Sequence, residues 1–210
     1  MNVHSFSGIM KKVNNKKEII LDAAVKVFAQ KGFYNAKVAD VAREAGIADG
    51  TIYLYFKNKD DLLISLFETK MEEILFQFNE RLKNITSPCE KLRQFILLHF
   101  EMIENNPDLA EVFQVELRQS NKFLKDYHNQ KFIDFLNIIG DILKEGKSRG
   151  EFKSDLKINS MKVAIFGAVD ELARQWILIE EPIYELKTTA LEIADLFIRG
   201  LSPTMSGGNI

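Results

Sequence analysis

The sequence of 210 residues has little of several features that mark common protein classes. Its single cysteine, Cys89, has no partner for an internal disulfide, which favours a reducing compartment and predicts a cytoplasmic protein. No run of about 18 apolar residues is present, so the sequence predicts no membrane span. With only four prolines and no sustained alternation of apolar and polar residues, it favours long helices over strands.

The usual signals of enzymes and metal sites are also missing. The three histidines, His4, His99 and His128, are too far apart in the sequence to match a metal-ligand spacing. No segment pairs a nucleophile with a base in a known pattern, and Cys89 falls where a helix is expected to begin. The sequence therefore predicts neither an enzyme nor a resident metal or cofactor.

Charge is distributed unevenly, although the formal net charge is only −2. Residues 1–60 contain ten Lys or Arg and six acids, whereas the remaining 150 residues contain 18 basic and 24 acidic side chains. A basic segment joined to an acidic one is typical of a polyanion-binding module attached to a different module. The alternative is a chance asymmetry among solvated helix faces.

Apolar residues recur every three or four positions along most of the chain, which is the period of amphipathic helices. We therefore predict an all-α protein of about nine helices. Residues 1–15 are expected to form a flexible arm and residues 203–210 a disordered tail. Asn35 is expected to cap the second helix, and a short third helix is expected over 49–56.

The second and third predicted helices, separated by Gly46, form a helix-turn-helix pattern. The second helix of such a unit enters the major groove of DNA. Ile52 and Phe56, four residues apart, are predicted to anchor that helix inward, so the positions between and beside them face outward. The candidate DNA-binding residues are Lys37, Gly50, Thr51, Tyr53, Tyr55, Lys57 and Lys59.

These residue types suit a nucleic-acid interface for different physical reasons. Gly50 permits close approach to a backbone, while Thr51 and the tyrosine hydroxyls can reach phosphates or base edges. Lys57 and Lys59 flank the start of the next predicted helix, where main-chain N–H groups also favour phosphate. The alternative for either tyrosine alone is packing against that next helix.

Residues 16–67 resemble the DNA-binding head of the TetR family of one-component repressors. The resemblance is carried by Ala23-Ala24, Phe28, Gly32-Phe33, Val41-Ala42, Ala45-Gly46, the segment from Gly50 to Lys59, and Leu62-Leu63. The sequence departs from the family at Val38, where most members have a threonine that touches phosphate. The resemblance implies palindromic double-stranded DNA as a partner and a homodimer formed through the last two long helices.

The body shows a narrower resemblance in the segments 116–121 and 167–171 and at Trp176, together with Ala48-Asp49-Gly50 in the head. These look closest to the acyl-CoA-responsive repressors of fatty-acid degradation. This implies a small hydrophobic effector, a long-chain acyl-CoA, that releases the protein from DNA. The candidate ligand-binding residues are Phe100, Phe113, Arg118, Asn121, Phe166 and Trp176. Arg118 is the candidate for the CoA phosphates because a guanidinium binds phosphate oxygens bidentately. Its alternative is a salt bridge to Glu111, Glu116 or another acid.

This interpretation divides the chain into a flexible arm (1–15), a helix-turn-helix domain (16–60), a ligand-binding and dimerisation domain (61–202) and a tail (203–210). The resulting hypothesis is a ligand-responsive repressor of fatty-acid metabolism. Two alternatives stay open: a repressor of an efflux pump that senses hydrophobic or cationic drugs, and a helical interaction protein with a vestigial head. Release by dyes would favour the first alternative, and absence of salt-dependent DNA affinity would favour the second.

Overall fold

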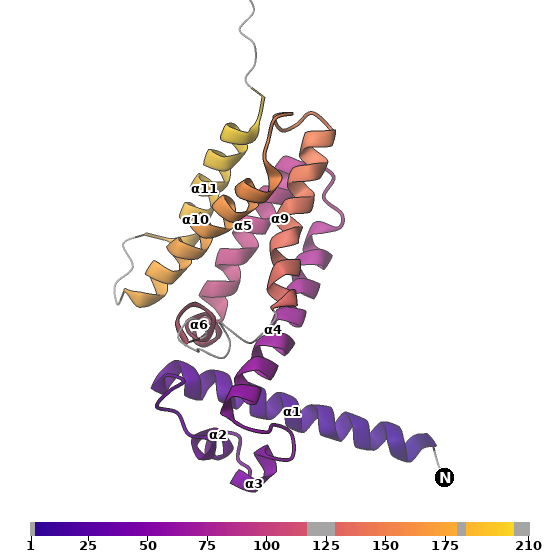
Figure 1. Cartoon of the computed structure of the whole chain (residues 1–210), viewed down its shortest axis with the longest axis vertical. Coiled ribbons are helices and arrows are strands. Elements are labelled where there is room, and N and C mark those ends of the chain that lie inside the picture. Colours follow the sequence, from indigo (N-terminus) through magenta and orange to yellow (C-terminus); the bar gives the residue numbers. More distant parts are fainter. Residues whose placement is uncertain (1–2, 117–128, 180–183, 204–210) are drawn as a thin grey trace, which may run out of the picture. The chain divides into compact units, whose positions relative to one another are not determined.

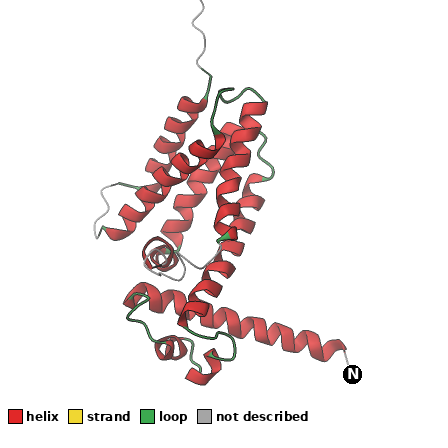
Figure 2. Ribbon diagram, in the orientation of Figure 1, coloured by secondary structure: helices red, strands yellow, loops and turns green. Residues whose placement is uncertain are grey.

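The computed structural model describes residues 3–116, 129–179 and 184–203, and every regular element in these ranges is a helix (Figure 2). The prediction of an all-α protein is thereby confirmed. The described α-helices are α1 (Val3–Lys31), α2 (Val38–Glu44), α3 (Asp49–Ile52), α4 (Lys59–Leu82), α5 (Pro88–Asn105), α6 (Pro107–Glu111), α9 (Gln130–Ser148), α10 (Ile158–Leu178) and α11 (Leu186–Leu201). A short π-helix, η1 (Val112–Glu116), follows α6. Among these helices none has both the length and the apolar character needed to cross a membrane.

The chain divides into two compact units. The first unit contains Met1–Lys70 and Asp108–His128, and the second contains Met71–Pro107 and Asn129–Ile210. The helix α4 is continuous and contributes residues to both units. The segment after Pro107 joins the first unit, where η1 packs against α1.

The first helix is longer than the sequence analysis proposed. The structure starts α1 at Val3 and continues it through the segment that was expected to be a flexible arm, which corrects that expectation for residues 3–15. The reason is visible in the sequence, because Val3, Phe6, Ile9 and Val13 follow the helical spacing of three and four. Of the predicted tail over 203–210, the structure describes only Pro203.

Side-chain caps fix the starts of two long helices, α4 and α5. At the start of α4 the main-chain N–H of Asp61 donates to Asn58 Oδ1 at 2.9 Å. At the start of α5 the N–H of Glu90 donates to Ser87 Oγ at 3.4 Å, with Pro88 in the first helical position. Each cap satisfies an N–H group that has no partner within the helix, and is worth about 1 kcal/mol.

The second unit is built around α5, which packs against α9, α10 and α11 (Figure 1). Phe78, Phe95 and Phe135 contact one another with ring centroids 5.0–5.2 Å apart. None of the three is more than 3% exposed. Because full burial of one such side chain contributes roughly 1.5–3 kcal/mol, this cluster is a main source of stability for the unit.

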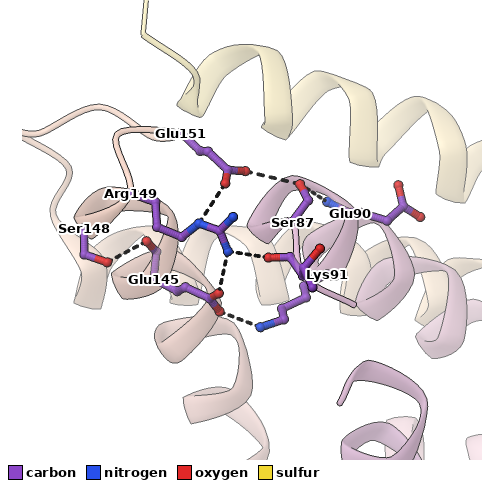
Figure 3. Close-up of polar contacts among 8 residues, drawn as sticks. Ser87, Glu90, Lys91, Glu145, Ser148, Arg149 and Glu151 are labelled. Carbon is purple, nitrogen blue, oxygen red and sulfur yellow. Dashed lines mark hydrogen bonds and ion pairs between the residues drawn. The ribbon is translucent and has the colours of Figure 1, made fainter. Parts of the chain in front are cut away.

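A polar network connects the beginning of α5 to the end of α9 (Figure 3). Arg149 donates to the main-chain oxygen of Thr86. It also forms ion pairs with Glu145 and Glu151, both at 3.1 Å. Lys91 on α5 pairs with Glu145 at 2.6 Å, and this hydrogen bond is the main cause of the lowered pKa of the Glu145 carboxyl. The network joins two helices of the second unit through charges that satisfy one another.

Candidate nucleic-acid interface

α2 and α3 form the helix-turn-helix that the sequence predicted. Between them Gly46 has φ of +66°, in the left-handed region that only glycine adopts easily. The N–H of Ile47 donates to the carbonyl of Ala42 at 3.0 Å and closes the turn. Ile52 and Phe56 are only 1% and 2% exposed, which confirms them as the inward anchors of the second helix.

The α-helical part of the recognition segment is shorter than the predicted range 49–56, because α3 ends at Ile52. The N–H groups of Tyr55 and Phe56 both donate to the Ile52 carbonyl, at 2.9 and 3.0 Å. Tight turns thus continue after the helix and carry Phe56 into the core of the first unit. The segment between these two anchors is held at both ends and presents its other side to solvent.

The seven DNA-binding candidates differ in exposure. Those exposed are Lys37, Gly50, Tyr53 and Lys57, and those half-buried are Thr51, Tyr55 and Lys59. A Cβ added at Gly50 would meet no atom within 4 Å, so this side of α3 is open to close approach. Tyr53 is 56% exposed, whereas the ring of Tyr55 lies 6.4 Å from that of Phe56. Tyr53 is therefore the tyrosine whose hydroxyl has the freer reach towards solvent.

Lys59 has a different environment from the one expected for a phosphate-binding lysine. Its ammonium donates to the carbonyl oxygens of Phe33, Tyr34 and Ala36, at 2.6, 3.1 and 2.9 Å. The same nitrogen lies 4.6 Å from the centroid of the Phe33 ring, a cation–π distance. Burial lowers the pKa of Lys59. Because an ammonium has three N–H donors and all three are used, this geometry favours a positioning role between the end of α1 and the start of α4.

The start of α4 also departs from the expected phosphate site. The carboxylate of Asp61 accepts the main-chain N–H of Lys57 at 2.8 Å, and Asn58 occupies the N–H of Asp61. Asp60 and Asp61 place two acids in the first turn. These acids already compensate the positive end of the helix dipole. The remaining candidate for a phosphate contact near the start of α4 is the exposed side chain of Lys57.

The start of α2 corrects one prediction about capping. Asn35 does not cap this helix, because its side-chain amide donates back to the carbonyl of Lys31 at 3.2 Å. The carboxylate of Asp40 instead accepts the main-chain N–H of Lys37 at 3.0 Å. The cap thus comes from inside the helix, and the Lys37 side chain at its entry is exposed.

Ion pairs hold α1 against α2. Asp40 pairs with Lys31 at 2.9 Å and with Arg43 at 3.5 Å, while Lys26 pairs with Glu44 at 3.2 Å. The hydrogen bond from Lys31 is the main cause of the lowered pKa of Asp40. These pairs position α2, which in turn positions α3 for the major groove.

Leu54 is a residue of this surface that the sequence analysis left out. It is 82% exposed, immediately after Tyr53. Helical spacing would have found it, because Leu54 lies midway between the two buried anchors Ile52 and Phe56 and must face the opposite side. An apolar side chain at this place can contact the methyl group of thymine.

The structure describes four of the six ligand-binding candidates. Arg118 and Asn121 lie outside the described residues. Phe113 on η1 belongs to the first unit, where its ring lies 5.1 Å from that of Phe67. Trp176 is half-buried on α10 in the second unit. The structure therefore does not gather these candidates into one described site.

Two of the remaining candidates do come together. Phe100 on α5 is 1% exposed and Phe166 on α10 is half-buried. The rings of both lie near the imidazole of His99, with centroid distances of 6.0 and 6.1 Å. His99 itself is 3% exposed.

A helix-turn-helix with an open recognition segment, attached to an all-helical second unit, defines a DNA-binding regulator. Residues 20–66 match the family model for bacterial regulatory proteins of the tetR family. Residues 67–200 match the model for the C-terminal region of YsiA-like proteins. The chain belongs to the tetR family of transcriptional regulators, which is not a family of enzymes.

Relatives of known role match almost the whole chain. The sequence is 40% identical to the fatty acid metabolism regulator protein of Bacillus subtilis (strain 168), over 91% of this chain and 98% of the relative. The crystal structure of the transcriptional regulator FadR from Bacillus subtilis, in complex with stearoyl-CoA, matches with a TM-score of 0.82 at 40% identity, covering 88% and 98% of the two chains. The fatty acid degradation regulator FadR from Bacillus halodurans matches with a TM-score of 0.81 at 38% identity and the same coverage.

Proposed function

We propose that this protein is a homodimeric repressor of genes for fatty-acid metabolism, which leaves its operator when a long-chain acyl-CoA binds the body. The observation that carries the proposal is the likeness to a regulator solved with stearoyl-CoA, because it extends over 98% of that chain. The likeness thus includes the ligand-binding part and not the DNA-binding head alone. A protein of this kind acts on the chromosome, in the bacterial cytoplasm.

The DNA-binding part of the proposal is supported by the recognition segment. Gly50, Tyr53 and Lys57 are exposed along it, and Lys37 is exposed at the entry to α2. In a dimer two such segments would enter successive major grooves of a palindrome, about one helical turn apart or a little more. Lysine and tyrosine would fix the register on phosphates, while Gly50 would lie closest to the bases.

The release mechanism is a coupling between two binding equilibria. An acyl-CoA lowers DNA affinity only if it binds better to a conformation whose two heads do not match the operator spacing. Couplings of this kind are typically about 1–3 kcal/mol, or roughly 5- to 150-fold in affinity. By reciprocity, operator DNA lowers the affinity for acyl-CoA by the same factor.

The DNA-binding part is tested by the salt dependence of affinity for duplex DNA from upstream of the protein's own gene, or for duplexes selected from random sequence. Each phosphate contact contributes close to one unit to the slope of log affinity against log salt. Lys57→Ala should therefore weaken binding and flatten this slope by about one unit. The matched control is Lys144→Ala, an exposed lysine on α9 of the second unit that should leave the slope unchanged. Equal slopes for the two variants would overturn the assignment of Lys57 to a phosphate.

A further inference from the structure

His99 is an unusual residue in the second unit because it is buried without hydrogen bonds. Its side chain is 3% exposed on α5. Neither Nδ1 nor Nε2 has a hydrogen-bond partner in the described part of the chain. A buried polar group in this state costs roughly 1–3 kcal/mol relative to a satisfied one. The chain therefore retains a cost that an apolar residue of similar size would avoid.

Three aromatic rings lie close to His99. The rings of Phe100, Phe135 and Phe166 have centroids 6.0–6.2 Å from that of the imidazole. Phe132 extends the group, because its ring lies 5.1 Å from that of Phe166. These rings offer a long alkyl chain an apolar environment and offer the imidazole no acceptor for its N–H.

The cluster is not sealed on every side. Phe135 and Phe100 are fully buried, whereas Phe132 on α9 and Phe166 on α10 are half-buried. The two half-buried rings contact each other, so the partly exposed side of the cluster lies between α9 and α10.

Burial also keeps the imidazole neutral near pH 7. It lowers the pKa of His99 to about 4, although the carboxylate of Asp170 on α10 acts in the opposite direction. A neutral imidazole has one N–H donor and one acceptor nitrogen. It therefore suits a neutral acceptor on a ligand, such as a carbonyl, better than it suits a phosphate or a carboxylate.

We propose that the imidazole N–H of His99 donates a hydrogen bond to the thioester carbonyl of a bound acyl-CoA. This inference rests on the proposed function, since it names a contact for the effector given there. An acyl chain contains no polar atom except at its thioester end, so the carbonyl is the acceptor that can arrive with alkyl carbons beside it. The aromatic rings around His99 would contact those alkyl carbons.

The test compares two probes, stearoyl-CoA and its thioether analogue S-octadecyl-CoA, in which a CH₂ group replaces the carbonyl. Calorimetric titration of the full-length protein gives the affinity for each. The wild-type protein should bind stearoyl-CoA about three- to tenfold more tightly, the factor expected for one hydrogen bond to a neutral group. His99→Phe should bind both probes equally, and His99→Gln should retain part of the preference because its amide can still donate.

A control variant separates loss of this hydrogen bond from loss of apolar contact. Phe166→Leu should weaken both probes by the same factor and keep the wild-type preference. Equal affinity of the wild-type protein for the two probes would overturn the proposal without any variant, and so would a full preference persisting in His99→Phe. Binding of neither probe by the wild-type protein would instead refute the acyl-CoA effector of the proposed function, and this contact with it.

Discussion

At the level of single residues, Lys59 is expected to contribute to stability and not to DNA contact. Its ammonium donates to three carbonyl oxygens of the loop after α1, while Lys59 itself begins α4. Lys59→Met should leave those carbonyls without their donor and destabilise the first unit by about 1–3 kcal/mol. Thermal melting followed by circular dichroism measures the effect. The control is Lys57→Met, two residues earlier and exposed, which should change DNA affinity but not the melting temperature. Equal melting temperatures for the two variants would contradict the positioning role.

His99 gives a pH dependence whose sign follows from burial. Its pKa is about 4 in the folded protein against an ordinary 6.5, so the unfolded chain binds a proton at higher pH than the folded chain does. The contribution of neutral His99 to the free energy of unfolding is present above pH 6.5 and is lost as the pH falls towards 4. Between pH 7 and pH 5 the loss should be about 2 kcal/mol. Urea unfolding at pH 7 and pH 5 measures it, and a wild-type pH dependence unchanged in His99→Phe would contradict the assignment.

At the scale of elements, the turn after α9 depends on a glycine. A Cβ at Gly146 would lie 2.1–2.8 Å from three carbons of the Phe152 ring, and Phe152 is 1% exposed. Gly146→Ala should therefore force this ring to move and destabilise the second unit by about 1–3 kcal/mol. The matched control is Gly200→Ala in the last turn of α11, where an added Cβ meets nothing within 4 Å. Urea denaturation should show no destabilisation in the control, and a comparable loss in both would contradict the steric explanation.

Much of the helix pattern could be predicted because local signals dominate it. Asn58 and Ser87 are caps that act within one turn, so their roles are readable from the sequence. The role of Lys59 was not readable, because its three acceptors are 23 to 26 residues away. Asn35 was misassigned for a different, local reason: its amide donates to the Lys31 carbonyl, and the carboxylate of Asp40 accepts the N–H of Lys37 at the start of α2.

The candidate sites show the same limit. The outward side of α3 could be predicted, since two inward anchors four residues apart determine it. The environment of His99 could not, because the rings around it come from α5, α9 and α10 and are brought together only by packing. A sequence pattern reports one helix at a time, so a site built from three helices leaves no local signal.

For the whole molecule, we expect a dimer formed through α10 and α11. Large apolar side chains are exposed on these two helices, at Val163 (57%), Leu178 (52%), Leu191 (41%) and Leu196 (64%). Burying them against a second copy would remove apolar surface from water. The double variant Leu191→Glu with Leu196→Glu should sediment as a monomer in analytical ultracentrifugation. Phe76→Glu, a change of the equally exposed Phe76 (67%) on α4, should leave the dimer intact. A dimer in both variants would place the interface elsewhere.

Fluorescence anisotropy can show whether an acyl-CoA releases the protein from DNA. The full-length protein is bound to labelled duplex from upstream of its own gene and titrated with stearoyl-CoA, with free stearate and a cationic dye as matched controls. Stearoyl-CoA should lower DNA affinity by roughly 5- to 150-fold, and neither stearate nor the dye should have much effect. If stearoyl-CoA leaves DNA binding unchanged and the dye weakens it, release by acyl-CoA is contradicted and the protein is a drug-responsive repressor instead.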